Sequence, residues 1–152
     1  MFHVIARPRR TVMVTAVAAL LGVAAMLSIS ASPASAKFRS CPTSDFCLYF
    51  NEDANGGMYH FEGNDRNLNN DRYEGQDTGE TVGDTSRYAT NHGSGPRQSD
   101  VIVYGRPGYQ GARDCIQKGD SGELPRNWWN NIESYRWVSR SECRQAGVIL
   151  FD

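Results

Sequence analysis

The sequence has few of the residues from which most enzyme active sites are built. It contains three histidines among 152 residues, and neither His60 nor His92 has metal-ligand spacing to a cysteine. A zinc site or a Ser-His-Asp triad needs such side chains in a recognisable set. No pair of carboxylates stands out from the scattered acids. These absences favour a protein that is not an enzyme and that requires no cofactor.

An excess of positive charge is also missing. The 16 Lys and Arg residues nearly balance the 17 Asp and Glu residues, and the two signs are interspersed. Nothing in this pattern favours a nucleic acid or an anionic membrane as partner. A convincing helical pattern is absent as well, so we expect an all-β protein.

The beginning of the chain differs in composition from the rest. Arg7, Arg9 and Arg10 precede an apolar run over residues 11–29, and small residues follow at 34–36 in the order Ala-Ser-Ala. This order is typical of a secretory signal peptide. A membrane anchor is the alternative, because a run of roughly 18 apolar residues can span a bilayer. The small residues at its end and the lack of a basic stop-transfer cluster favour secretion.

Removal of a signal peptide over residues 1–36 leaves an extracellular domain over residues 37–152. Three of the 16 basic residues and none of the 17 acidic residues lie in the leader, so the domain has a net charge of −4. All four cysteines lie in the domain, and an even number in a small exported chain predicts two disulfides. Three pairings are possible. Short spacing favours the pairing Cys41–Cys47 with Cys115–Cys143.

Short runs of aromatic and β-branched residues predict strands in this domain. Clusters of Gly, Asn, Asp and Pro between the runs predict turns. The polar stretch 63–84 is expected to form an extended loop, and residues 91–99 divide the chain into two halves. The predicted strands are residues 46–50, 58–62, 101–105 and 134–138.

The two halves repeat one pattern of spacing. In the second half, Tyr104 is followed after five residues by Tyr109 and after seven by Gly111. At an offset of 55, Tyr49 leads in the same way to an alanine and then to Gly56. A hairpin that folds back over its own strand explains the spacing, because its glycine takes a positive φ that a β-carbon would resist. The aromatic residue two positions earlier packs over the hairpin.

A second match supports the duplication. Residues 83–91 align with residues 130–138 at an offset of 47, which gives copies of roughly 40–45 residues, the scale of one repeated supersecondary unit. Four short strands per copy make a Greek key, and two Greek keys pack as a β-sandwich. We expect the first Greek key over about 41–92, the second over about 100–139 and a C-terminal tail over 140–152.

These motifs resemble a known family. "YGRPGYQG" and the later "WWNNIESYRW" look like a βγ-crystallin Greek-key motif, and "CPTSDFCLYF" is similar to the start of the secreted metalloproteinase inhibitors of peptidase inhibitor family thirty-six. The resemblance covers residues 41–138, although Ala54 stands where the first hairpin should have an aromatic residue. It implies a disulfide-clipped sandwich of two βγ-crystallin-type Greek keys. It also implies a secreted, monomeric inhibitor of an extracellular metalloprotease.

An inhibitor of this kind presents a rigid, substrate-like loop, and rigidity lowers the entropic cost of binding. The resemblance places the loop at Arg113, Asp114, Cys115, Ile116 and Gln117. Ile116 would be the bulky aliphatic residue after the scissile bond, and a disulfide at Cys115 would anchor the other side. The alternative is that Cys115 and Ile116 belong to a strand with Ile116 in the core, where isoleucine is most often found.

The same resemblance raises calcium binding as a second function. Crystallin-type sites take oxygen ligands from an Asn/Asp-Asn/Asp-x-x-Ser/Thr-Ser pattern in both repeats. Asn130, Asn131 and Ser134 match it, Tyr135 replaces the last serine, and the first copy retains only Asp84. The structural alternative is a turn at the two asparagines, with Ser134 bonded to the backbone. Competing functions are therefore a module that binds calcium or cell-surface material, and a small secreted toxin.

Overall fold

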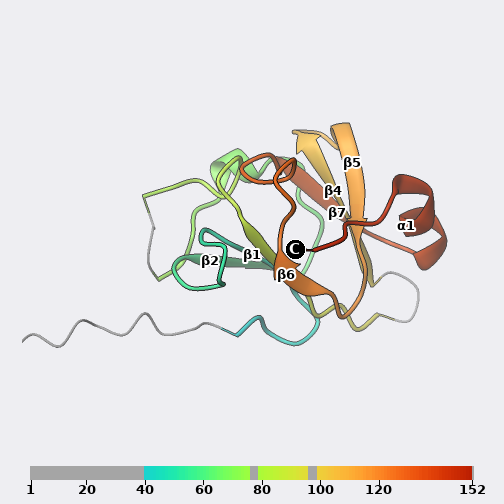
Figure 1. Ribbon diagram of the computed structural model, residues 1–152, viewed down its shortest axis with the longest axis horizontal. Helices are drawn as coiled ribbons and strands as arrows, with labels where there is room; N and C mark the ends of the chain where they lie inside the picture. Colours follow the sequence, from blue (N-terminus) through green and yellow to red (C-terminus); the bar gives the residue numbers. More distant parts are fainter. Residues whose placement is uncertain (1–39, 76–78, 96–98, 152) are drawn as a thin grey trace, which may run out of the picture. The chain divides into compact units, whose positions relative to one another are not determined.

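Two antiparallel sheets contain most of the regular structure in residues 40–75, 79–95 and 99–151, which this computed structural model describes (Figure 1). The predicted signal peptide, residues 1–36, lies outside the described residues. The elements in chain order are β1 (Phe46–Tyr49), β2 (Met58–Phe61), the 3-10 helix η1 (Leu68–Asn70), β3 (Tyr88–Asn91), β4 (Asp100–Arg106), β5 (Gln110–Ile116), β6 (Ser121–Glu123), β7 (Ser134–Val138) and α1 (Arg140–Ala146). The strand orders are β2-β1-β3-β6 and β5-β4-β7.

The first half of the chain supplies β1, β2 and β3 to one sheet, and the second half supplies β4, β5 and β7 to the other. Each half also contributes one further segment to the sheet of the other half. β6 comes from the second half but pairs with β3 of the first, with Tyr88 opposite Glu123. In return, Asp65 of the first half pairs with Tyr135 in β7, and the two residues exchange backbone hydrogen bonds of 3.0 and 2.9 Å. This reciprocal exchange joins two Greek keys into one sandwich. The predicted all-β fold of two Greek keys is confirmed.

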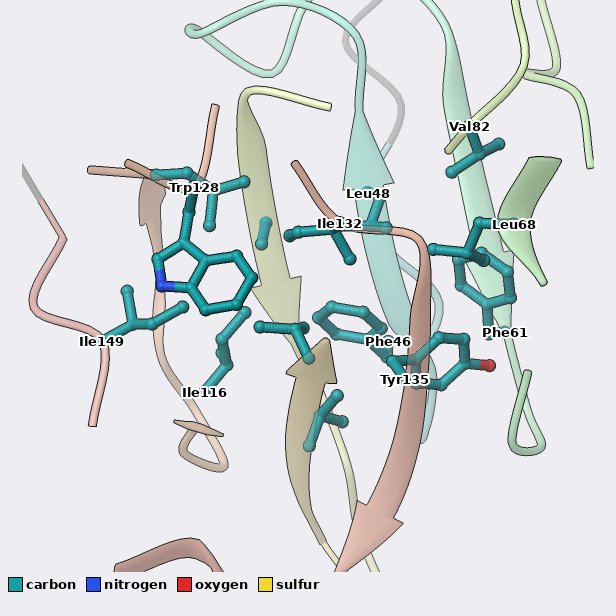
Figure 2. Packing of buried hydrophobic residues seen from close by; sticks show 14 of the residues in the cluster. Phe46, Leu48, Phe61, Leu68, Val82, Ile116, Trp128, Ile132, Tyr135 and Ile149 are labelled. Carbon is teal, nitrogen blue, oxygen red and sulfur yellow. The ribbon is translucent and has the colours of Figure 1, made fainter. Parts of the chain in front are cut away.

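The main core lies between the sheets, where alternate side chains of each strand point to the same face. Phe46 and Leu48 of β1, and Val101 and Val103 of β4, are completely buried there. The ring of Phe46 packs against Tyr135 with 5.1 Å between centroids (Figure 2). Side chains two residues apart on each strand therefore meet across the sandwich.

The polar stretch 63–84 is packed against this core. Its described residues contain η1 and isolated β-bridges but none of the seven strands, as expected for an extended loop. Leu68, Tyr73 and Val82 are nevertheless buried and belong to the main apolar cluster. The Leu68 N–H donates to the Glu133 carbonyl at 2.9 Å. This segment of the first half is therefore attached to the second half by packing and by backbone hydrogen bonds.

The helix α1 lies in the tail, beside β4 and β5 (Figure 1). A capping box starts it: the Ser139 hydroxyl accepts from the Glu142 N–H, and the Glu142 carboxylate accepts from the Ser139 N–H at 3.0 Å. The expectation of a chain without helices is therefore wrong for the tail, because seven residues are too few to show an apolar period. No helix among the described residues is long and apolar enough to cross a membrane.

Both predicted disulfides are present. Cys41–Cys47 closes a short loop at the start of β1, and Cys115–Cys143 joins β5 to α1. No cysteine of the described residues is free. Two disulfides in a domain of this size are consistent with an extracellular protein.

Candidate functional site

A serine from β7 holds the β4–β5 hairpin in shape. Ser134 is completely buried, donates its hydroxyl to the Arg106 carbonyl at 2.7 Å and accepts from the Tyr109 N–H at 3.0 Å. Tyr109 and Gly111 have φ values of 64° and 81°, so the positive φ predicted for the glycine is confirmed. The Tyr109 ring packs on Tyr104 with 5.7 Å between centroids. The hairpin is therefore fixed by the packing of Tyr109 on Tyr104 and by the two hydrogen bonds of Ser134.

The first hairpin follows the same backbone path with a smaller residue at the key position. Ala54 and Gly56 have φ values of 57° and 99°. Ala54 is buried in a small cluster with Tyr49 and the Cys41–Cys47 disulfide. The disulfide thus occupies part of the space over the first hairpin, where an aromatic residue is missing.

β5 is an outer strand, and its first part is exposed. β4 is its only partner strand in the described part of the chain, and residues 110–113 are all exposed. Further along, the Cys115 N–H donates to the Gly147 carbonyl, and its carbonyl accepts from the Ile149 N–H, both at 2.8 Å. In an antiparallel pair, every second residue directs its N–H and C=O away from the partner strand. Arg113, two residues earlier, therefore directs its N–H and C=O away from β4.

The structure places the five predicted loop residues on β5 and just after it. Cys115 and Ile116 have no exposed surface. Asp114 and Gln117 are half-buried, and Arg113 is exposed. Ile116 lies in the core cluster with Trp128 and Ile149 (Figure 2). The strand alternative is therefore confirmed, with Ile116 in the core, and the role of Ile116 as a contact residue stays a prediction. Exposing a buried isoleucine would forfeit about 1.5–3 kcal/mol.

Asp114 and Cys115 tie the exposed strand to the body of the protein. The Asp114 carboxylate accepts from the indole N–H of buried Trp128 at 2.7 Å, and Cys115 is bonded to Cys143 of α1. The hairpin held by Ser134 lies at the other end. We call the exposed residues 110–113 between these anchors the β5 edge.

The candidate calcium residues lie on two loops that face each other across the halves. The Asp84 N–H donates to the Ile132 carbonyl at 3.3 Å, and the Asn130 N–H donates to the Ser86 carbonyl at 3.0 Å. Burial and, after it, the neighbouring Glu133 carboxylate raise the pKa of Asp84. Glu133 was not singled out from the sequence, because only the contact between the loops brings it to Asp84.

Some of the predicted calcium ligands already have partners. The Ser134 hydroxyl is bonded to the backbone of the hairpin, as the structural alternative predicted. The Asn131 amide donates to a backbone carbonyl four residues earlier at 3.1 Å. Among the described residues, the group of three metal-ligating side chains that lies together is Asp100, Cys115 and Cys143, but both sulfurs form the disulfide. A calcium site stays a prediction.

Comparison with known proteins agrees with the resemblance seen in the sequence. The model of "Peptidase inhibitor family I36" matches residues 34–116, more than half of the chain. No curated protein matches. A solved structure described as "Evolution of the eye lens beta-gamma-crystallin domain fold" is 15% identical, with a TM-score of 0.52 over 66% of this chain and 92% of that chain.

A second structure, the N-terminal domain of protein S, is 21% identical, with a TM-score of 0.46 over 63% of this chain and 97% of that one. At 15% identity, the crystallin likeness shows the fold alone. The family match shows more, because it includes the cysteine-rich start, the first Greek key and the strands β4 and β5. The chain belongs to peptidase inhibitor family I36 and has the βγ-crystallin fold.

Proposed function

We propose that this protein inhibits a secreted metalloprotease and that the β5 edge contacts the enzyme. Membership of a peptidase inhibitor family supports a protease as partner. The observation that carries the contact surface is an exposed strand anchored at both ends, by Ser134 at the hairpin and by the Cys115–Cys143 disulfide.

An exposed strand edge can bind an extended segment of a partner through backbone hydrogen bonds. Arg113 offers an outward N–H and C=O for two such bonds, and its exposed side chain belongs to a residue type enriched at the centres of interfaces. Ordering a flexible side chain on binding costs about 0.5–1.5 kcal/mol. The backbone of β5 is already ordered before binding, so binding costs little further backbone entropy.

The test is a titration of thermolysin-type and other secreted metalloproteases with the full protein. Enzyme activity should fall linearly and vanish near a 1:1 ratio. Arg113→Pro removes the outward N–H at an edge position where proline is tolerated. A neutral hydrogen bond contributes about 0.5–1.5 kcal/mol, so we expect inhibition to weaken by roughly twofold to tenfold. Arg113→Ala, the matched control, keeps the N–H and should weaken inhibition less.

The two parts of the proposal fail separately. If none of the metalloproteases loses activity, the proposed target class is wrong. If wild type inhibits and Arg113→Pro inhibits equally well, inhibition stands but the β5 edge is not the contact. Thermal melts of both variants should stay close to that of wild type, which separates lost contact from lost folding.

Calcium binding is a second candidate, supported by the acidic pair that the two halves form. Asp84 and Glu133 come from opposite halves and lie close enough to raise the pKa of Asp84. Calcium prefers six to eight oxygen ligands, and carboxylates are its strongest protein ligands. If the ion binds, added calcium raises the melting temperature by mass action, and Asp84→Asn removes the rise. An unchanged wild-type melt would end this proposal.

A further inference from the structure

A hollow lies at one end of the sandwich, where loops of the first half meet β7 of the second. β1 begins where β2 and β3 end, with Phe46 opposite both Phe61 and Asn91, so the segments that flank these ends come together. The hollow measures about 380 Å³, within the range of about 300–1,000 Å³ found for small-molecule sites. Its lining consists of Ser44, residues 62–64, residues 93–95 and Trp137.

The hollow is separate from the two sites considered above. Asp84 precedes β3 and residues 93–95 follow it, so the candidate calcium residue and the hollow lie toward opposite ends of that strand. None of residues 110–113, the β5 edge, belongs to the described lining. A ligand in the hollow would therefore occupy a third surface of the domain.

Trp137 forms the aromatic wall of the hollow and is held on two sides. Its backbone N–H donates to Oδ1 of Asn64 at 2.8 Å. A β-carbon on Gly93 would lie 2.6 Å from Cζ3 of the indole, so the ring packs directly against the backbone of Gly93. The indole N–H is buried, and the exposed part of this half-buried ring is therefore carbon. A ring fixed in this way offers an apolar surface to a ligand at little cost in side-chain entropy.

The other side chains of the lining are polar. Glu62 is exposed and offers carboxylate acceptors. Asn64 uses its carbonyl oxygen on Trp137, which leaves its amide N–H groups as donors toward a ligand. The hydroxyls of Ser44 and Ser94 bond to each other at 2.5 Å, and the Ser44 N–H donates to a backbone carbonyl of the segment after β3 at 3.1 Å. The hollow therefore combines one apolar wall with donors and acceptors on a tied framework.

We propose that the hollow binds an uncharged saccharide unit, whose ring lies on the indole of Trp137 and whose hydroxyls bond to Glu62 and Asn64. A sugar ring has faces of C–H groups and a rim of hydroxyls that both donate and accept, and the hollow offers a counterpart to each. A wholly apolar ligand would leave the polar lining groups unpaired, which costs free energy. This inference does not depend on the proposed protease inhibition.

The charge of the hollow argues against an anionic ligand. Glu62 would repel a phosphate or carboxylate, and the described lining residues include no Lys or Arg to offset it. An amine is the competing ligand, because a carboxylate beside an aromatic ring attracts cations. The amide of Asn64 and the serine hydroxyls favour the saccharide, since an amine offers them no partner of its own to accept or donate in return.

The test titrates the full protein with four uncharged tetrasaccharides and follows the amide and indole signals by NMR. The probes are cellotetraose, maltotetraose, mannotetraose and N-acetylated chitotetraose, with choline as the competing cation. At least one tetrasaccharide should give saturable shifts of the Trp137 indole N–H and of the amides of residues 62–64 and 93–95. The amides of the β5 edge should keep their positions.

Two variants test the assigned contacts. Glu62→Gln keeps the shape of an exposed side chain but replaces a charge-assisted acceptor by a neutral one, and affinity should fall about fivefold. Glu52→Gln is the matched control, because Glu52 is an exposed carboxylate outside the lining, and it should bind as wild type does. Trp137→Phe has a smaller aromatic surface and should also bind more weakly.

Three results would overturn the proposal: no tetrasaccharide shifts the signals of the hollow, choline binds more tightly than every tetrasaccharide, or Glu62→Gln binds as tightly as wild type. The wild-type and Glu62→Gln titrations decide the matter even if Trp137→Phe does not fold.

Discussion

Replacing Ser134 by alanine should damage the second Greek key far more than the loss of one oxygen atom suggests. The hydroxyl donates to the Arg106 carbonyl at 2.7 Å and accepts from the Tyr109 N–H at 3.0 Å, and Ser134 has no exposed surface. The substitution leaves a backbone donor and a backbone acceptor without their partner. No other side chain is positioned to bridge the two groups in the described part of the hairpin.

The magnitude follows from the two orphaned groups. Leaving a buried polar group unpaired costs about 1–3 kcal/mol. Arg106 is exposed, so water can reach its carbonyl, whereas the half-buried Tyr109 N–H is harder to solvate. Tyr109 also holds a left-handed φ of 64°, a conformation that costs a residue with a β-carbon about 1 kcal/mol. We expect a total loss of about 2–3 kcal/mol in the free energy of unfolding.

Urea denaturation followed by tryptophan fluorescence measures this loss. For a domain of this size the melting temperature should fall by roughly 10–15 °C. Ser141→Ala is the control, because Ser141 is an exposed serine on α1 and should change stability by less than about 0.5 kcal/mol. If Ser134→Ala unfolds at the same urea concentration as the control, the hairpin does not depend on this hydroxyl and our account of the repeated motif fails.

Three further predictions concern the core, the disulfide and Asp71. Ile116→Ala should lower stability in urea by about 2–5 kcal/mol, yet inhibit as well as wild type per folded molecule; a selective loss of inhibition would restore Ile116 as a contact. Replacing both Cys115 and Cys143, 28 residues apart, by alanine should cost about 3–4 kcal/mol in the same assay, and an unchanged melt would contradict this. The pKa of Asp71 rises from 3.8 to about 6 on folding, so the native state binds more protons between these values and stability should fall as pH rises through this window. After discounting for solvent screening, we expect a fall of about 1–2 kcal/mol, absent in Asp71→Asn; equal pH profiles for the two proteins would refute it.

Local patterns predicted much of the fold because strand and turn preferences depend on near neighbours. The predicted strands 46–50, 58–62, 101–105 and 134–138 end within one residue of β1, β2, β4 and β7. β3, β5 and β6 gave no comparable apolar run. β6 has the sequence Ser-Gly-Glu and is a strand through its pairing with β3, so its conformation depends on a segment more than 30 residues away.

The candidate site shows the same division. The sequence pointed to the segment around Cys115 through the family resemblance, but not to which of its residues reach solvent. Ile116 is buried because Trp128 and Ile149, from later segments, cover its side of β5. The burial of a carboxyl oxygen of Asp71 was also invisible, since this residue belongs to no motif and its surroundings depend on how the polar segment folds onto the core.

The sequence by itself determined the duplication, the positive-φ glycine of each hairpin, the disulfide framework and the all-β class. Each of these depends on spacing or composition over a few residues. Only the tertiary structure decided the reciprocal exchange between the halves, the exposed edge of β5 and the burial of Ile116. The physical reason is that burial and strand exposure are set by segments distant in the chain, and the positions of these segments follow from the packing of the whole domain.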